Sequence, residues 1–210
     1  MSLFEEISEN LIKGKADEVK SLVEKGLADG EAADDLLNKG LLAGMSVVGE
    51  RFKKNEVYVP EVLIAARAMK AGSEVLKPEL AKAGVKPVGT VVLGTVKGDL
   101  HDIGKNLVGM MLEGAGFKVV DVGIDVEPQK FVESAKESGA VVIAASALLT
   151  TTMTNMKEVV DAVKASDVSD KAKVIIGGAP VTQAFCDEIG ADGYAPDAAS
   201  AAELAKSMAG

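Results

Sequence analysis

The sequence predicts an α/β protein in which an N-terminal four-helix bundle cap precedes a Rossmann-like (flavodoxin-like) domain with a five-stranded parallel sheet. Two observations lead to this prediction. Residues 1–83 are rich in Leu, Ala, Lys and Glu, and their apolar residues recur at helical spacing. Residues 88–210 alternate short apolar segments with helical patterns, as consecutive βα units do. We therefore expect a helical bundle domain over residues 1–85, a linker near residues 83–87 and an α/β domain over residues 88–210.

Four sets of apolar residues predict the helices of the bundle. They lie at Leu3–Leu11, Val19–Val23, Leu36–Val48 and Val62–Met69. Pro60 comes just before the fourth set and suits the first turn of a helix, where a missing N–H removes no hydrogen bond. Gly14, Gly26 and Gly30 are expected to interrupt the first helical segments.

Five short apolar segments predict the strands of the sheet. Continuous runs such as VVIAASAL suit parallel strands that helices cover on both faces. The expected strands are Val88–Thr95, Phe117–Val122, Ala140–Ala147, Lys173–Gly177 and a weaker one at Gly193–Ala195. In such sheets ligands bind outside the carboxyl ends of the strands. The loops to consider for a site are therefore Lys97–Gly104, Ser146–Thr152 and Gly177–Pro180.

The composition argues against several classes of function. Lys and Arg number 23 against 32 Asp and Glu, and the net charge of −9 disfavours nucleic acids and anionic membrane surfaces. A single cysteine, Cys186, rules out an internal disulfide, and a single histidine, His101, rules out sites that need two. The sequence contains no signal-peptide pattern and no apolar run long enough to span a membrane, so we expect a cytoplasmic protein.

One loop combines the histidine with a carboxylate and two glycines. It reads GDLHDIGKN, and Asp99 lies two residues before His101. In an extended segment such side chains point the same way, so Asp99 can accept one imidazole N–H and leave the other nitrogen for a metal. Gly98 and Gly104 would let a large planar ligand approach the backbone. From these residues alone, an ordinary surface pair is the alternative interpretation.

The same loop resembles the signature of cobalamin-binding domains. Asp99, His101 and Gly104 match the pattern D-x-H-x-x-G. The wider segment GTVKGDLHDIGKN is similar to the corresponding part of cobalamin-dependent methionine synthase and of the small corrinoid proteins of methyltransferase systems. Ser146–Leu148 matches the S-x-L motif of the family and Gly177–Gly178 its G-G motif, in the same order along the chain. The resemblance extends from about Leu36 to the C-terminus.

The resemblance implies a cobalamin or related corrinoid bound base-off. The nucleotide tail would enter a slot in the sheet, and His101 would be the metal ligand at the lower axial position. Asp99, His101 and Thr152 would carry the chemistry as a relay, with Thr152 at a position where the family has serine. Thr150–Thr152 also fits a helix N-cap. The expected cofactor contacts in this domain are Gly98, Asp99, His101, Asp102, Ile103, Gly104, Ser146, Leu148, Thr150, Gly177, Gly178, Tyr194 and Ala195.

The helical half resembles the family as well. The segment VVGERFKKNEVYVPEVLIAARAMK is similar to the helical cap that precedes the cobalamin domain of methionine synthase. The matching residues Phe52 and Val59 would cover the upper face of the corrin ring. Val59 fits core packing of a helix pair equally well, and Met69 is expected in the core.

The function that the resemblance implies is methyl transport rather than catalysis by this chain alone. The corrinoid would cycle between Co(I) and methyl-Co(III), linking a substrate-specific methyltransferase to a second methyltransferase that acts on tetrahydrofolate or a thiol such as coenzyme M. The donor would be a methoxylated aromatic, a methylamine, a betaine or methanol. A reductive activation protein is a further expected partner. The alternatives are an adenosylcobalamin-binding domain of a mutase, a corrinoid-based sensor and an α/β domain that binds no corrinoid.

Overall fold

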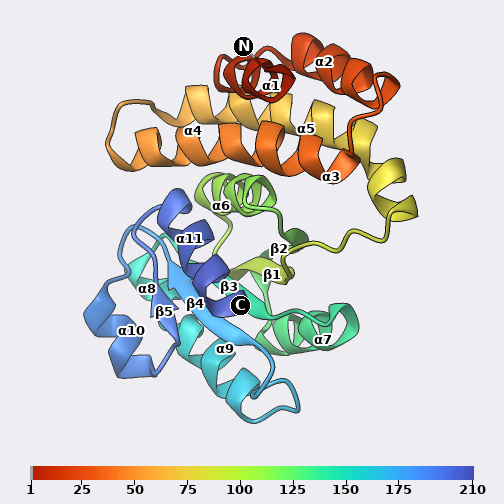
Figure 1. The fold of residues 1–210 in the computed structure, drawn as a ribbon. Helices are drawn as coiled ribbons and strands as arrows, with labels where there is room; N and C mark the ends of the chain where they lie inside the picture. The colour runs from red at the N-terminus through yellow and green to blue at the C-terminus, as the bar shows by residue number, and fades with distance from the viewer. Residues whose placement is uncertain (1) are drawn as a thin grey trace. The chain divides into compact units, whose positions relative to one another are not determined.

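The computed structural model describes residues 2–210 and divides into two compact units. The first unit, here called the helical unit, ends at Pro87 and also takes in Gly114–Gly116. The second, here called the sheet unit, consists of Val88–Glu113 and Phe117–Gly210. Figure 1 shows the elements of both units.

The helical unit contains the four predicted helices, and the third is a composite of three segments. In chain order the elements are α1 (Leu3–Ile12), α2 (Ala16–Ala28), α3 (Ala33–Asp35), the π-helical segment η1 (Leu36–Leu42), α4 (Ala43–Lys53) and α5 (Val59–Lys82). Ser2 and Glu5 form a capping box at the start of α1. Pro60 lies in the first turn of α5, as predicted, and the Glu61 carboxylate accepts a hydrogen bond from the Tyr58 backbone N–H at 3.0 Å.

Glycines determine both where these helices end and how closely they pack. Gly14 and Gly30 follow α1 and α2 with φ of +71° and +90°. The prediction that Gly26 also interrupts a helix is wrong, because Gly26 lies inside α2 and is buried. A Cβ at Gly26 would come within 2.6 Å of the Leu36 side chain, so this glycine permits close helix packing instead. Met69 lies in the core of the bundle, as expected.

The sheet unit has the predicted five parallel strands, in the order β2-β1-β3-β4-β5 that is typical of flavodoxin-like folds. In chain order its elements are β1 (Thr90–Val96), α6 (Ile103–Gly114), β2 (Lys118–Val126), α7 (Pro128–Ser138), β3 (Val142–Ser146), α8 (Thr150–Met153), α9 (Asn155–Lys164), β4 (Lys173–Gly177), α10 (Gln183–Ile189), β5 (Gly193–Tyr194) and α11 (Ala198–Ala209). Helices α6 and α11 lie on one face of the sheet, and α7 and α9 on the other (Figure 1).

The largest departure from the predicted strands is at β2, which continues to Val126 instead of ending at Val122. The apolar run stops because Asp121, Gly123 and Asp125 are part of the strand. Since β2 is at the edge of the sheet, polar side chains there can reach solvent. Its pairing with β1 shifts register between Leu93 and Val96.

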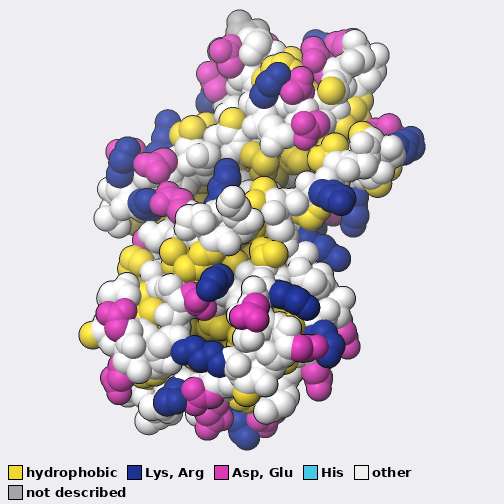
Figure 2. Space-filling model, turned by 60° about the horizontal axis from the view of Figure 1, so that its bottom comes forward, with side chains coloured by type: hydrophobic (Ala, Val, Ile, Leu, Met, Phe, Trp, Pro, Cys, Tyr) yellow, Lys and Arg dark blue, Asp and Glu magenta, His cyan; other side chains and the backbone are white. Residues whose placement is uncertain are grey.

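The surface carries charges of both signs. On the face drawn in Figure 2, basic and acidic side chains are interspersed, with hydrophobic side chains exposed between them. Among the helices of residues 2–210, none combines the length and the apolar character that crossing a bilayer would require.

Candidate functional site

The strand register brings the predicted loops to one edge of the sheet. Thr95 of β1 pairs with Ser146 of β3, and Ser146 pairs with Gly177 of β4. Tyr194 of β5 pairs with Ile176 of β4, the residue just before Gly177. Because all strands are parallel, the loops that follow β1, β3 and β4 leave the sheet side by side at its carboxyl edge.

The Asp99 carboxylate is the centre of the hydrogen bonding at this edge. Its side chain is 0% exposed. Oδ1 accepts hydrogen bonds from the His101 backbone N–H at 3.0 Å and from the imidazole Nδ1 at 2.7 Å. Oδ2 accepts from the Leu148 backbone N–H at 2.8 Å and from the Thr152 hydroxyl at 2.5 Å. One buried carboxylate thus connects the loop after β1 with the loop after β3.

These donors determine the charge of Asp99 and the tautomer of the histidine. Burial acts to raise the pKa of Asp99, but hydrogen bonds from Thr152, from the Leu148 and His101 amides and from the imidazole outweigh it and hold the pKa well below its usual range. The carboxylate is therefore ionised near neutral pH and can only accept, so Nδ1 carries the hydrogen of the shared bond. The other ring nitrogen, Nε2, takes no part in this bond, and the side chain is 49% exposed, so Nε2 could serve as a metal ligand.

Thr152 does not lie where an N-cap residue would. The N-cap of α8 is Leu149, which has no side-chain cap bond, so the N-cap interpretation of Thr150–Thr152 is wrong. Thr152 lies in the single turn of α8, where its hydroxyl donates to Asp99 and also lies 3.1 Å from the Leu149 carbonyl oxygen. The structure thus contains the Asp99–Thr152 hydrogen bond that a relay requires, and Thr150 lies exposed at the start of the same turn.

The remaining predicted residues of the histidine loop lie between the end of β1 and the first turn of α6. Gly98 has a left-handed backbone with φ of +78°. Asp102 accepts hydrogen bonds from Asn106, through its backbone carbonyl at 2.7 Å and its carboxylate at 3.1 Å. Ile103 is 78% exposed. Gly104 is exposed in the first turn of α6, and a Cβ there would meet nothing within 4 Å.

The neighbouring backbone comes so close to Gly177 and Gly178 that neither position has room for a side chain. A Cβ at Gly177 would lie 2.9 Å from the Ala195 carbonyl oxygen. Gly178 has φ of +136°, and a Cβ there would lie 1.8 Å from the Ala147 carbonyl oxygen. The close approach of the neighbouring backbone is therefore enough to require both glycines. That they also make room for a nucleotide tail stays a prediction.

Sequence reasoning missed several exposed apolar side chains at this edge. Leu100 precedes His101, Leu149 follows Leu148, and Ile124 lies near the end of β2; all three are exposed. With Ile103 and Leu148 they give an apolar surface to the loops that hold the histidine. A half-exposed imidazole with a free nitrogen, among exposed apolar side chains, fits a large planar ring with a metal at its centre.

The predicted contacts outside these loops are at β5 and in the helical unit. Tyr194 is half-buried at the end of β5, and Ala195 lies just beyond the strand, where its N–H donates to the Ile176 carbonyl at 3.0 Å. Phe52, in the last turn of α4, and Val59, at the start of α5, are both half-buried. Their contact with a corrin ring stays a prediction.

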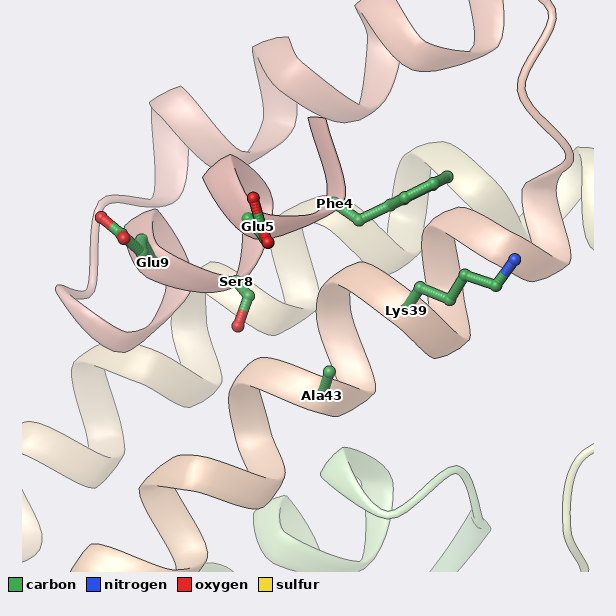
Figure 3. Close-up of a pocket in the computed structure, with 6 residues that line it drawn as sticks. All are labelled: Phe4, Glu5, Ser8, Glu9, Lys39 and Ala43. Carbon is green, nitrogen blue, oxygen red and sulfur yellow. The ribbon is translucent and has the colours of Figure 1, made fainter. Parts of the chain in front are cut away.

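The helical unit also contains a groove between α1 and the η1–α4 helix, with a volume of about 590 Å³ (Figure 3). Its lining residues are Phe4, Glu5, Ser8, Glu9, Lys39 and Ala43, so it contains none of the predicted site residues. The Lys39 ammonium lies 5.7 Å from the centre of the Phe4 ring. The groove is thus mixed in polarity and does not share the chemistry of the histidine loop.

Two family models match this chain and show its family. A family model described as a B12 binding domain matches residues 89–203, and a second model of the same description matches residues 3–77. The chain therefore belongs to the B12-binding family. The matches begin well before Leu36, so the family likeness covers more of the helical half than the sequence motifs indicated.

Relatives over the full length of the chain are corrinoid proteins. A corrinoid protein of Desulfitobacterium hafniense is 45% identical and covers 100% of this chain and 99% of its own length. Dimethylamine corrinoid protein 2 of Methanosarcina mazei is 45% identical over 98% of this chain and 96% of its own length. The solved methanol:cobalamin methyltransferase complex of Methanosarcina barkeri contains a chain with a TM-score of 0.86 and 31% identity, over 99% of this chain and 79% of that chain.

Proposed function

We propose that this protein carries a methyl group on a corrinoid between a substrate-specific methyltransferase and a second methyltransferase. The relatives support this role, because one is named a dimethylamine corrinoid protein and another chain comes from a methanol:cobalamin methyltransferase complex. A bound corrinoid supplies a cobalt centre that can accept and release the methyl group. The protein supplies position and axial ligation, so it is not expected to catalyse transfer alone. Its third expected partner is a reductive activation protein.

The observation that carries the binding mode is the hydrogen bond between His101 Nδ1 and the buried Asp99 carboxylate. It fixes the tautomer and would leave Nε2 to ligate the cobalt of a base-off corrinoid. Thr152 holds the second oxygen of the same carboxylate. We assign the lower face of the ring to Gly98, Asp102, Ile103 and Gly104. We assign the nucleotide tail to Ser146, Leu148, Thr150, Gly177, Gly178, Tyr194 and Ala195, and the upper face to Phe52 and Val59.

Replacing His101 tests this proposal most directly. Apo-protein is incubated with hydroxocobalamin and desalted, and the visible spectrum is recorded beside that of His101→Ala. The wild type is expected to retain a red corrinoid, and the variant to show a shifted spectrum because its cobalt lacks the imidazole. Far-ultraviolet circular dichroism should give equal helix content for both apo-proteins, since the imidazole is half-exposed. If neither protein retains colour, corrinoid binding is wrong. If both retain the same spectrum, histidine ligation is wrong.

Dimethylamine and methanol are the first donors to assay with partner enzymes.

Gly104→Ala should separate corrinoid binding from stability. A Cβ at this position meets no atom of the protein, and alanine in a helix is favoured over glycine by about 0.5–1 kcal/mol. The apo-protein should therefore unfold at the same or a higher urea concentration. If the ring lies against Gly104, the added methyl group occupies its space, and hydroxocobalamin should bind at least about tenfold more weakly, or about 1.4 kcal/mol. Equal affinity, measured by absorbance titration, would remove Gly104 from the ring contacts.

A further inference from the structure

A second carboxylate, that of Asp125 near the end of β2, holds the histidine loop in place. Asp125 Oδ1 accepts a hydrogen bond from the Gly98 backbone N–H at 2.7 Å. The Asp125 backbone N–H donates to the Asp99 carbonyl oxygen at 3.0 Å. The two bonds bracket Gly98 and Asp99, the residues that lead into His101. One residue of β2 therefore fixes both the backbone N–H and the backbone C=O of this part of the loop.

The backbone of Asp125 makes this double contact possible. Its φ is +53°, a left-handed conformation that Asp and Asn adopt more readily than other residues with a side chain. It lies where the pairing of β1 and β2 is irregular, just before Val126 pairs with Val96. Gly98, which it faces, is also left-handed, with φ of +78°. Strained conformations of this kind persist where the surrounding contacts determine them and cluster at functional sites.

A neighbouring interaction joins the same two segments without contacting the loop's backbone. The Lys97 ammonium and the Glu127 carboxylate form an exposed ion pair at 2.9 Å. Exposed ion pairs contribute little to stability. Asp125 differs from Glu127 in that it bonds the backbone of the histidine loop. Replacing Glu127 therefore controls for the loss of a negative charge at this edge.

We propose that Asp125 is a positioning residue for His101. By fixing Gly98 and Asp99, it places the Asp99 carboxylate where the Leu148 amide and the Thr152 hydroxyl reach one oxygen and the imidazole reaches the other. The orientation of the imidazole then depends on Asp125, although the two hydrogen bonds of Asp125 go to the backbone of Gly98 and Asp99. That this orientation serves cobalt ligation rests on the proposed function.

Three variants separate the side chain from the backbone conformation. Asp125→Gly keeps the left-handed backbone and its N–H but removes the acceptor for Gly98. Asp125→Asn keeps both an acceptor oxygen and the tolerance for positive φ. Glu127→Gln removes the charge of the exposed ion pair alone. Thermal unfolding of each apo-protein, followed by circular dichroism, confirms that the compared proteins are folded.

The first readout needs no corrinoid. The protein has one histidine, so its ring gives a single set of NMR signals. In Asp125→Gly these signals should move, and the Gly98 amide should exchange roughly fivefold faster, as expected for loss of a hydrogen bond of about 1 kcal/mol. In Asp125→Asn and Glu127→Gln the ring signals should stay in place. Unchanged ring signals in folded Asp125→Gly would overturn the proposal.

The second readout is the visible spectrum after loading with hydroxocobalamin. Asp125→Gly should move from the wild-type spectrum toward that of His101→Ala, and Asp125→Asn should restore the wild-type spectrum. A wild-type spectrum in Asp125→Gly would also overturn the positioning role. If wild type and His101→Ala have the same spectrum, histidine ligation has failed, and the ring signals of the apo-protein still decide whether Asp125 positions His101.

Discussion

Gly178→Ala is expected to destabilise the sheet unit by about 3–5 kcal/mol, because it combines a steric clash with a backbone conformation that alanine avoids. The added Cβ would lie 1.8 Å from the Ala147 carbonyl oxygen and 2.9 Å from its carbonyl carbon, with φ of +136°. Both atoms belong to the backbone just after β3, so no side-chain rotation relieves the contact. Urea unfolding of the apo-protein, followed by circular dichroism, measures the loss.

Gly139→Ala is the matched control for this substitution. Gly139 ends α7 with φ of +64°, and a Cβ there would meet nothing within 4 Å. This variant carries only the cost of a left-handed alanine, about 1–2 kcal/mol. Equal unfolding midpoints for the two variants would show that the Gly178 loop moves aside readily, and the close approach to Ala147 would then not be a structural requirement.

The fold could be predicted because its central strands are continuous apolar runs. β3 and β4 are buried on both faces, so their sequences have few polar residues. The same logic failed at β2, where edge position allows aspartates inside a strand. It also gave no sign of the π-helical turn in η1, since a π-helical segment keeps an apolar face much like that of an α-helix. Gly26 was misinterpreted because its role depends on Leu36, which belongs to another helix.

The site could be predicted in part because its central residues form a short motif. Asp99 and His101 are two positions apart, so the sequence alone suggested their hydrogen bond. The Leu148 backbone amide also binds Asp99, but backbone donors leave no signature in a sequence. Asp125 was missed for a related reason, since its partners are backbone groups of a loop far away in the sequence.

Asp99→Ala is expected to cost about 3–5 kcal/mol of unfolding free energy, because it removes the acceptor of several buried donors at once. The Leu148 and His101 amides lose their partners outright. In Asp99→Ala the Thr152 hydroxyl still has the Leu149 carbonyl as an acceptor. Thr152→Val removes one donor only, and Asp99 Oδ2 keeps the Leu148 amide, so this variant should cost only about 1 kcal/mol. The stability loss of Asp99→Asn should fall between those of Asp99→Ala and Thr152→Val. Its amide NH₂ would face hydrogen-bond donors where Asp99 has a carboxylate oxygen that accepts. Urea denaturation of the four apo-proteins ranks them. A loss below about 1 kcal/mol for Asp99→Ala would show that solvent satisfies these groups.

The pH dependence of the same variants tests the charge on Asp99. Its native pKa lies below the unfolded value of about 3.9, so its stabilising contribution is fully present above that value and declines as the pH falls toward the native pKa. The stability difference between wild type and Asp99→Asn should thus shrink as the pH falls below about 4. A difference that stays constant down to pH 3 would mean that Asp99 has the same pKa in the native and the unfolded protein, and the lowered native pKa would then be wrong.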